Sequence, residues 1–330
     1  MNDGEAALCW RLFNVTWIPI GAMAALVAVT VASGRFTIGV GSFGVMAGVG
    51  ALLAVAAYRE AARGEAADQR RLFLPGAAAQ AVFVTIIVGP LSYIAAAVGS
   101  GFAFQDHALA AIDTVLHFDP RSAILFVNER PWLSTLLDFG YGMIKWPLLG
   151  VPIILAMAGR LLRLQHYTLA LSLALVVTIA ISVFAPAFGN YHELGLAAAD
   201  VPRVDIHMVT GSEQDIVAVR NGSLRHLELL ALVGLVTFPS FHAASAFLFA
   251  WALYPVRLVG PVAVALNALM IASTPVIGGH YLIDVIAGMV VAALSILAAT
   301  RLSSLLSARA PMRAARPADR DLPQPASAGP

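Results

Sequence analysis

Long apolar runs follow one another along almost the whole chain, and only short charged segments separate them. A membrane-spanning helix requires about 20 consecutive apolar residues, and only helices and closed barrels can cross a lipid bilayer. The composition agrees, because 59% of the 330 residues are hydrophobic and 12% are charged, with a mean hydropathy of +0.82. A soluble domain has about 25% charged residues. We therefore expect an all-α polytopic membrane protein.

The apolar runs predict about eight transmembrane helices. They cover residues 12–33, 36–57, 73–98, 132–158, 168–188, 227–256, 261–279 and 280–300. The run at 227–256 is too long for one helix, and we expect it to break near Thr237–Pro239. In the second run, Gly44 and Gly48 permit close helix contact. The first run lacks a small-residue cleavage site, so we interpret it as a retained helix rather than a signal peptide.

The distribution of arginines predicts the orientation in the membrane. Four arginines fall within residues 59–71, between the second and third runs, and short arginine-rich loops are usually cytoplasmic. An even number of spans then places both termini inside. It also places the segments 99–131 and 189–226 on the extracytoplasmic side, with an interfacial amphipathic helix expected within Phe104–Leu116.

Two histidines are expected to meet at the extracytoplasmic surface. His242 follows Pro239-Ser240 at the start of one span, and His280 follows the next span, which returns to the same face. Asp284 lies four residues after His280, so both side chains would project from one side of a helix. A carboxylate in a membrane helix is costly without a partner, and here the partner is the histidine.

This pattern suits nucleophilic chemistry on a phosphate. An Asp that accepts from one imidazole nitrogen fixes the tautomer and leaves the other nitrogen free to attack. Pro is tolerated in the first turn of a helix and Ser is a good N-cap, so Ser240 is expected at a helix start. The free N–H groups of a helix start form an anion site.

The same residues resemble two signatures of the type 2 phosphatidic acid phosphatase superfamily. Pro239-Ser-Phe-His242 resembles the second signature, and Ser273-Thr274, His280 and Asp284 are spaced like the third, Ser-Arg-x5-His-x3-Asp. The residues around both histidines, 238–243 and 280–285, are most similar to the branch of the superfamily that contains the inositol phosphorylceramide synthases. The resemblance implies a six-helix catalytic core at 72–303. Two added helices and a cytoplasmic loop (1–71) would precede this core, and a disordered cytoplasmic tail (304–330) would follow it.

The resemblance also assigns roles. It implies that His280 takes the phosphoryl group, that Asp284 orients His280, that His242 protonates the leaving oxygen, and that Ser240 helps to hold the phosphate. The chain departs from the family in its cations: Thr274 stands where the third signature has Arg, and the first signature, Lys-x6-Arg-Pro, is absent.

Other cations must then offset the phosphate charge. Arg130 belongs to an Arg-Pro pair, and Arg220 precedes the His242 motif. Lys145 lies inside a span, where charges usually have a function, although it can also form a structural pair with Asp138. We predict Arg130, Arg220 and Lys145 as candidate phosphate-binding residues.

We expect metal-independent phosphatase or phosphotransferase activity on a membrane lipid, without a cofactor. The net charge of +1 gives no reason to expect nucleic acid, and the single cysteine excludes an internal disulfide. Alternatives are a transferase resembling the inositol phosphorylceramide synthases and a non-catalytic lipid carrier or scaffold on the same fold. Two packed histidines without chemistry, or a bis-histidine haem, explain fewer of the motif residues. A transporter would show inverted repeats and more charges at mid-membrane.

Overall fold

The computed structural model describes residues 3–308, and helices make up about three quarters of this part of the chain. The α-helices are α1 (Asp3–Ala32), α2 (Val40–Ala61), α3 (Gln69–Val98), α4 (Asp106–Val115), α5 (Pro120–Asn128), α6 (Pro131–Gly142), α7 (Lys145–Met157), α8 (Leu161–Phe184), α9 (Asn190–Leu194), α10 (His207–Asn221), α11 (Phe241–Leu253), α12 (Gly260–Ile277) and α13 (Leu282–Ala308). Short 3₁₀ turns are η1 (Gly64–Ala66), η2 (Gly99–Gly101) and η3 (Leu229–Ala231), and the strands are β1 (Thr37–Ile38) and β2 (His226–Leu227). The predicted all-α polytopic fold is confirmed. Helix α13 continues to Ala308, and the remainder of the predicted tail, 309–330, lies outside the described residues.

Among the described residues, six helices are long and apolar enough to cross a membrane. They are α1, α2, α3 with η2, α8, α12 and α13. Helices α6 and α7 count as a seventh span if they cross together, although they meet at a bend of 57°. Helix α11 is apolar but has only 13 residues. The predicted number of spans is therefore reached only when the bent pair and the short helix are both included.

The predicted span at 227–256 is α-helical only within α11. The chain before it forms β2 and η3 and then runs without regular structure to Ser240. Pro239 has no backbone N–H, and the Ser240 side chain caps the helix start by accepting from Ala243 N. Pro255 prevents continuation at the other end, because it has no N–H to donate. The predicted break near Thr237–Pro239 is thus present, and it shortens the helix to a half-length element.

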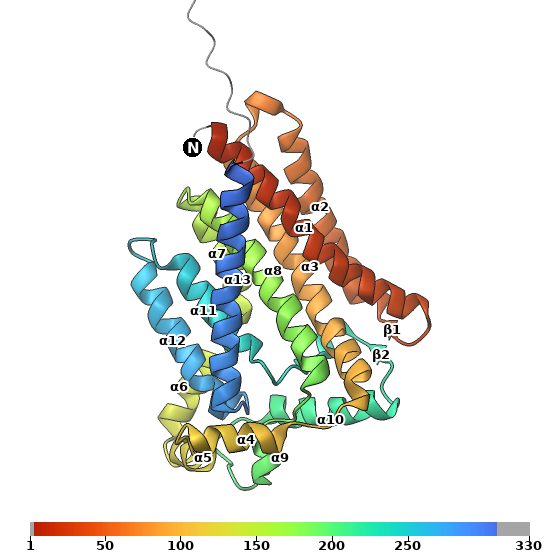
Figure 1. The fold of residues 1–330 in the computed structure, drawn as a ribbon, viewed down its shortest axis with the longest axis vertical. Helices are drawn as coiled ribbons and strands as arrows, with labels where there is room; N and C mark the ends of the chain where they lie inside the picture. Colours follow the sequence, from red (N-terminus) through yellow and green to blue (C-terminus); the bar gives the residue numbers. More distant parts are fainter. Residues whose placement is uncertain (1–2, 309–330) are drawn as a thin grey trace, which may run out of the picture.

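The long helices form one bundle (Figure 1). Helices α1 and α2 pack against α3, and α13 packs against both α8 and α11. At the end of α13, Arg11 Nη1 of α1 donates to the Leu306 carbonyl at 3.1 Å. One buried apolar cluster contains both Leu12 of α1 and Phe249 of α11. The N-terminal helices therefore share a core with the rest of the bundle, and the domain boundary predicted after residue 71 stays a prediction.

Four short helices, α4, α5, α9 and α10, gather at one end of the bundle, opposite the start of α1 and the end of α13 (Figure 1). We refer to these four helices as the cap. Strands β1 and β2 pair in parallel through Thr37↔His226 and Ile38↔Leu227, which ties the turn between α1 and α2 to the chain leaving α10. The helix expected within Phe104–Leu116 is present as α4.

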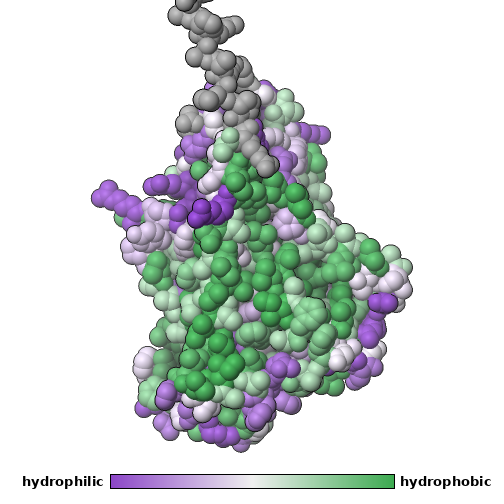
Figure 2. All heavy atoms as spheres, in the orientation of Figure 1, coloured by the Kyte–Doolittle hydropathy of each residue, from purple (hydrophilic) through white to green (hydrophobic). Residues whose placement is uncertain are grey.

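Hydrophobic side chains cover the sides of the bundle on the face shown in Figure 2, and hydrophilic ones gather toward its two ends. Lipid chains offer no hydrogen bonds, so this distribution matches a bundle that spans a membrane. Gly44 and Gly48 of α2 contribute no close packing there, because a Cβ at either position would meet no atom within 4 Å among the described residues. Gly50 of the same helix does, since a Cβ there would lie 3.0 Å from the Phe83 ring of α3. The helix contact that Gly44 and Gly48 permit is not formed within residues 3–308.

Candidate active site

His280 and Asp284 form a buried pair where α12 gives way to α13. Asp284 lies in the first turn of α13, whereas His280 precedes the helix by two residues. The expectation that both residues lie on one helix is therefore wrong, because Gly278 and Gly279, the latter at φ +67°, turn the chain before α13 begins. Even so, His280 Nδ1 lies 3.2 Å from Asp284 Oδ2, and both side chains are buried.

The Asp284 carboxylate also organises the start of α13. Its Oδ2 accepts a hydrogen bond from Tyr281 N at 2.9 Å, which is one half of a capping box, in which a side chain at the third helical position bonds back to the N-cap amide. The other oxygen, Oδ1, has no hydrogen-bond partner within the described part of the chain. His280 Nδ1 and Tyr281 N thus both contact the same carboxylate oxygen, Asp284 Oδ2.

The contact with Asp284 assigns the tautomer of His280. An ionised carboxylate only accepts, so Nδ1 carries the proton and Nε2 keeps its lone pair. Nε2 faces Ser240 Oγ at 3.4 Å. The attacking nitrogen of the sequence-based hypothesis therefore points toward the first turn of α11.

Ser240 caps α11 and also joins the two sequence motifs through its backbone. Its Oγ accepts from Ala243 N at 3.3 Å as the N-cap of α11, as predicted. Its backbone N donates to the Asp284 carbonyl at 3.0 Å. Its carbonyl lies so close to Gly288 that a Cβ there would be 2.2 Å away. Only glycine at position 288 permits this approach of α11 to α13.

His242 lies in the first turn of α11 and is held by an aromatic contact. Its ring stacks on Tyr141 of α6, with ring centroids 4.0 Å apart and planes 10° apart. The Tyr141 ring also borders Gly278, where a Cβ would lie 2.6 Å from the ring. No described residue forms a hydrogen bond with the His242 ring nitrogens. Tyr141 was not predicted as a site residue, since no spacing rule connects α6 with α11.

Two predicted phosphate-binding cations, Arg130 and Lys145, have no contact with the histidines. The Arg130 guanidinium lies 3.6 Å from the Phe126 ring centroid, and its Nη1 donates to the Phe126 carbonyl at 2.8 Å. Lys145 is the first residue of α7, just after the 57° bend, and its exposed side chain forms no ion pair with a described residue. Neither side chain contacts His280, and their roles stay predictions.

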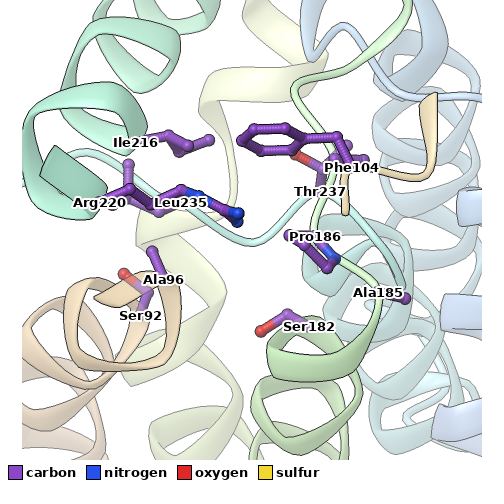
Figure 3. Close-up of a pocket in the computed structure, with 11 residues that line it drawn as sticks. Ser92, Ala96, Phe104, Ser182, Ala185, Pro186, Ile216, Arg220, Leu235 and Thr237 are labelled. Atoms are coloured by element: carbon purple, nitrogen blue, oxygen red, sulfur yellow. The ribbon is translucent and has the colours of Figure 1, made fainter. Parts of the chain in front are cut away.

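The third cation, Arg220, lies in the last turn of α10. Its Nη2 donates to the carbonyls of Ser100 (2.9 Å) and Phe102 (2.7 Å), and its guanidinium stacks 4.2 Å from the Phe104 ring centroid. Figure 3 shows Arg220 directed into a cavity of about 20 Å³, which Thr237 also lines. This space holds about one water molecule. Arg220 therefore fastens the segment after α3 to α10 and does not contact the histidines.

Together, a polytopic helical fold and a buried His–Asp pair beside a capped helix start define a membrane protein with a histidine-centred site. The family model of the PAP2 superfamily matches residues 107–298. This match covers more than half of the chain and all the motif residues, so the chain belongs to the PAP2 superfamily. No curated protein and no solved structure matches the chain. Membership supports phosphatase-type action on lipid phosphates in general, and the family comprises phosphatases and phosphotransferases.

Proposed function

We propose that the protein is a metal-independent lipid phosphatase or phosphotransferase that works through a phosphohistidine at His280. The observation that carries the proposal is the placement of the His280 ring, with Nδ1 on Asp284 and Nε2 facing Ser240 at the start of α11. In the first step, the Nε2 lone pair attacks phosphorus and the bond to the lipid oxygen breaks. Asp284 stabilises the positive charge that the imidazole ring gains.

His242 is the acid of this step. Protonated His242 gives its proton to the departing lipid oxygen, so the leaving group departs as an alcohol. In the second step, water or another alcohol attacks phosphorus, the N–P bond breaks, and the proton of the attacking hydroxyl returns to His242. The stack on Tyr141 leaves the edge of the His242 ring available for these transfers.

The start of α11 is the proposed phosphate cradle. No described residue accepts a hydrogen bond from the backbone N–H groups of Phe241 and His242. These two N–H groups belong to the first turn of α11, a helix of 13 residues that begins beside His280. Unpaired N–H groups and the helix dipole stabilise anions, so they offset part of the charge on the equatorial oxygens.

The proposed site faces the extracytoplasmic side. The arginine-containing turn between α2 and α3 lies at the end of the bundle opposite the cap (Figure 1). The site lies at the cap end, because the residues around His280 contact α4 and α9. The positive-inside tendency then places the cap outside and both termini inside.

Transfer to an alcohol, as in the inositol phosphorylceramide synthases, is the second candidate. It is favoured by burial, since His280 is 4% exposed and Asp284 is fully buried. A site that excludes water can favour an alcohol acceptor over hydrolysis. Thr274, which replaces the family's Arg, is buried and donates to the Met270 carbonyl, so it offers no charge to a phosphate.

The test uses purified full-length protein in detergent with EDTA, and compares wild type with His280→Ala. Phosphate release from phosphatidic acid or a related lipid phosphate that persists in EDTA and is lost in the variant supports the phosphatase. Head-group transfer from a phospholipid to ceramide, again lost in the variant, supports the transferase. Activity that disappears with EDTA, or that survives in His280→Ala, contradicts the mechanism. Inactivity with every lipid favours the carrier.

A further inference from the structure

The loop that carries His280 is held by polar groups that the proposed chemistry does not use. This loop, residues 278–281, connects α12 to α13. A connection of this kind is usually among the more mobile parts of a fold, yet a nucleophile must keep its geometry within about an ångström. Three buried side chains from the cap supply the restraint: Asp106, Asp113 and Asn190.

Asp113 of α4 holds the start of α13, directly after the loop. Its Oδ2 accepts from Leu282 N at 2.8 Å and its Oδ1 accepts from Ile283 N at 3.0 Å. These are the first N–H groups of α13, which a helix cannot satisfy internally. Burial raises the pKa of the Asp113 carboxyl above its usual value, and the hydrogen bonds from the two N–H groups offset part of this increase. A residue 169 positions away in sequence from Leu282 thus caps the helix that begins beside the nucleophile.

Asn190, the first residue of α9, holds the other side of the loop. Its Nδ2 donates to the carbonyls of His280 and Pro275, each at 2.8 Å, and its backbone N donates to the Gly279 carbonyl at 2.8 Å. The preceding Gly189 adopts φ +122°, and a Cβ there would lie 2.5 Å from the Gly279 carbonyl oxygen. The α9 segment is therefore in direct contact with the backbone of His280.

Asp106 connects these two restraints. It accepts from the backbone N–H groups of Phe188 and Gly189, and its Oδ1 also accepts from the Tyr281 hydroxyl at 3.0 Å. Asp106 and Asp113 are seven residues apart, which places them on one face of α4. Helix α4 thereby holds the start of α13 through Asp113. Through Asp106 it contacts Tyr281 of the loop and also fixes the segment that carries Asn190.

We propose that Asp113, Asp106 and Asn190 are positioning residues, which hold the loop so that the His280 ring stays between Asp284 and Ser240. The inference rests on the proposed function of His280 for its kinetic part only. None of the three side chains contacts the His280 ring or the Asp284 carboxylate, so they act through the backbone of residues 279–283 and through the Tyr281 hydroxyl. In this arrangement a helix of the cap determines the reactivity of a residue at the end of the bundle.

The experiment compares Asp113→Ala with Asp119→Ala in full-length protein. Asp119 is a matched control, because it caps α5 in the same cap by accepting from Arg121 N at 3.0 Å and does not contact the loop. Loss of positioning is expected to lower kcat about 10–100-fold with little change in KM. Asp119→Ala is expected to retain the wild-type kcat. Asp113→Asn keeps one acceptor oxygen and is expected to lie between.

Amide hydrogen exchange gives a readout that does not depend on activity. Positioning predicts faster exchange at His280 and Tyr281, which Asp113 does not contact, in Asp113→Ala but not in Asp119→Ala. Equal thermal destabilisation of both variants, with wild-type exchange at His280 and wild-type kcat, would overturn the proposal and leave a structural cap. If the wild type itself lacks activity, the proposed function fails while the exchange data still decide the positioning. Should Asp113→Ala not fold, Asp113→Asn provides the same comparison.

Discussion

The two histidines of the site are held in different ways. His280 has a polar partner at each ring nitrogen, Asp284 and Ser240, and its backbone is fixed by α9. His242 has a stacked Tyr141 ring, and no described residue bonds to its nitrogens. The His280 ring is thus fixed in its tautomer and in its direction. The stack fixes only the plane of the His242 ring, and its two nitrogens have no hydrogen-bond partner among the described residues.

This difference fits the two tasks. A nucleophile needs its lone pair aimed at one point, and a fixed tautomer provides that. A group that first gives and later takes a proton must be able to exist in both protonation states, and a permanent hydrogen bond to either nitrogen would favour one of them. The comparison predicts that the activity of His280 depends on its polar partners, so that a substitution removing one of them lowers kcat. The activity of His242 depends instead on the aromatic ring stacked against it.

The largest effect in this comparison is expected from Asp284→Asn. The amide loses the carboxylate charge and no longer favours a proton on His280 Nδ1, so the wrong tautomer is populated. We expect kcat to fall about 10⁴-fold. Turnover of a lipid phosphate by the purified variant measures this, with circular dichroism as the control for folding. A variant with wild-type kcat would show that Asp284 serves only to cap α13.

Substitution of His242 is expected to have an effect that depends on the leaving group. With a lipid alkyl phosphate, His242→Ala should lower kcat about 10²–10⁴-fold, since general acid catalysis contributes that much. With an aryl phosphate, whose leaving group departs without a proton, the loss should be much smaller. Rates for both ester types in wild type and variant decide the matter, and equal losses would contradict the acid role.

Gly288→Ala tests the contact between the two motifs. The new Cβ would lie 2.2 Å from the Ser240 carbonyl oxygen, so Ser240 must move away from His280. Overpacking of this kind costs about 1–3 kcal/mol, and a displacement of about 1 Å near the chemistry costs up to about 10²-fold in rate. Gly44→Ala in α2 is the control, because a Cβ there meets no atom within 4 Å. Thermal melting and kcat of both variants measure the effect; equal values would show that the close approach is unimportant.

The smallest effect is expected at Tyr141. Stacked aromatic pairs contribute about 0.5–1.5 kcal/mol, so Tyr141→Leu should lower kcat about tenfold by freeing the His242 ring, whereas Tyr141→Phe keeps the stack and most of the activity. Steady-state rates of the two variants provide the comparison. A loss as large in Tyr141→Phe as in Tyr141→Leu would assign the role to the hydroxyl instead.

The fold was predictable from the sequence because apolar length alone identifies membrane helices. The start of α11 was also predictable, since Pro239 and Ser240 are local signals. The length of α11 was not, because the apolar residues 229–236 pack against α3 without forming an α-helix, and Leu232 there meets Gly89. Hydropathy does not distinguish such a segment from a helix.

Spacing predicted that His280 and Asp284 would meet, but for the wrong local reason. It assumed an unbroken helix, whereas the pair forms between a loop and a first helical turn. The residues that hold this loop were missed, since Asp113 and Asn190 are 167 and 90 positions from His280. The seven-residue spacing of Asp106 and Asp113 was the sequence signal that could have identified them. It places two carboxylates on the same face of an amphipathic helix, where buried carboxylates need hydrogen-bond partners. The cations were not predictable, because long side chains reach many alternatives.

The most direct test of the account is the search for a phosphorylated enzyme. Protein mixed with a phosphorus-labelled lipid phosphate and quenched with base after a few milliseconds should carry acid-labile, base-stable label on the peptide that contains His280. The label should disappear when turnover is complete, and His280→Ala should show none. A burst of product without any labelled protein, or label that maps to another residue in the wild type, would contradict catalysis by His280.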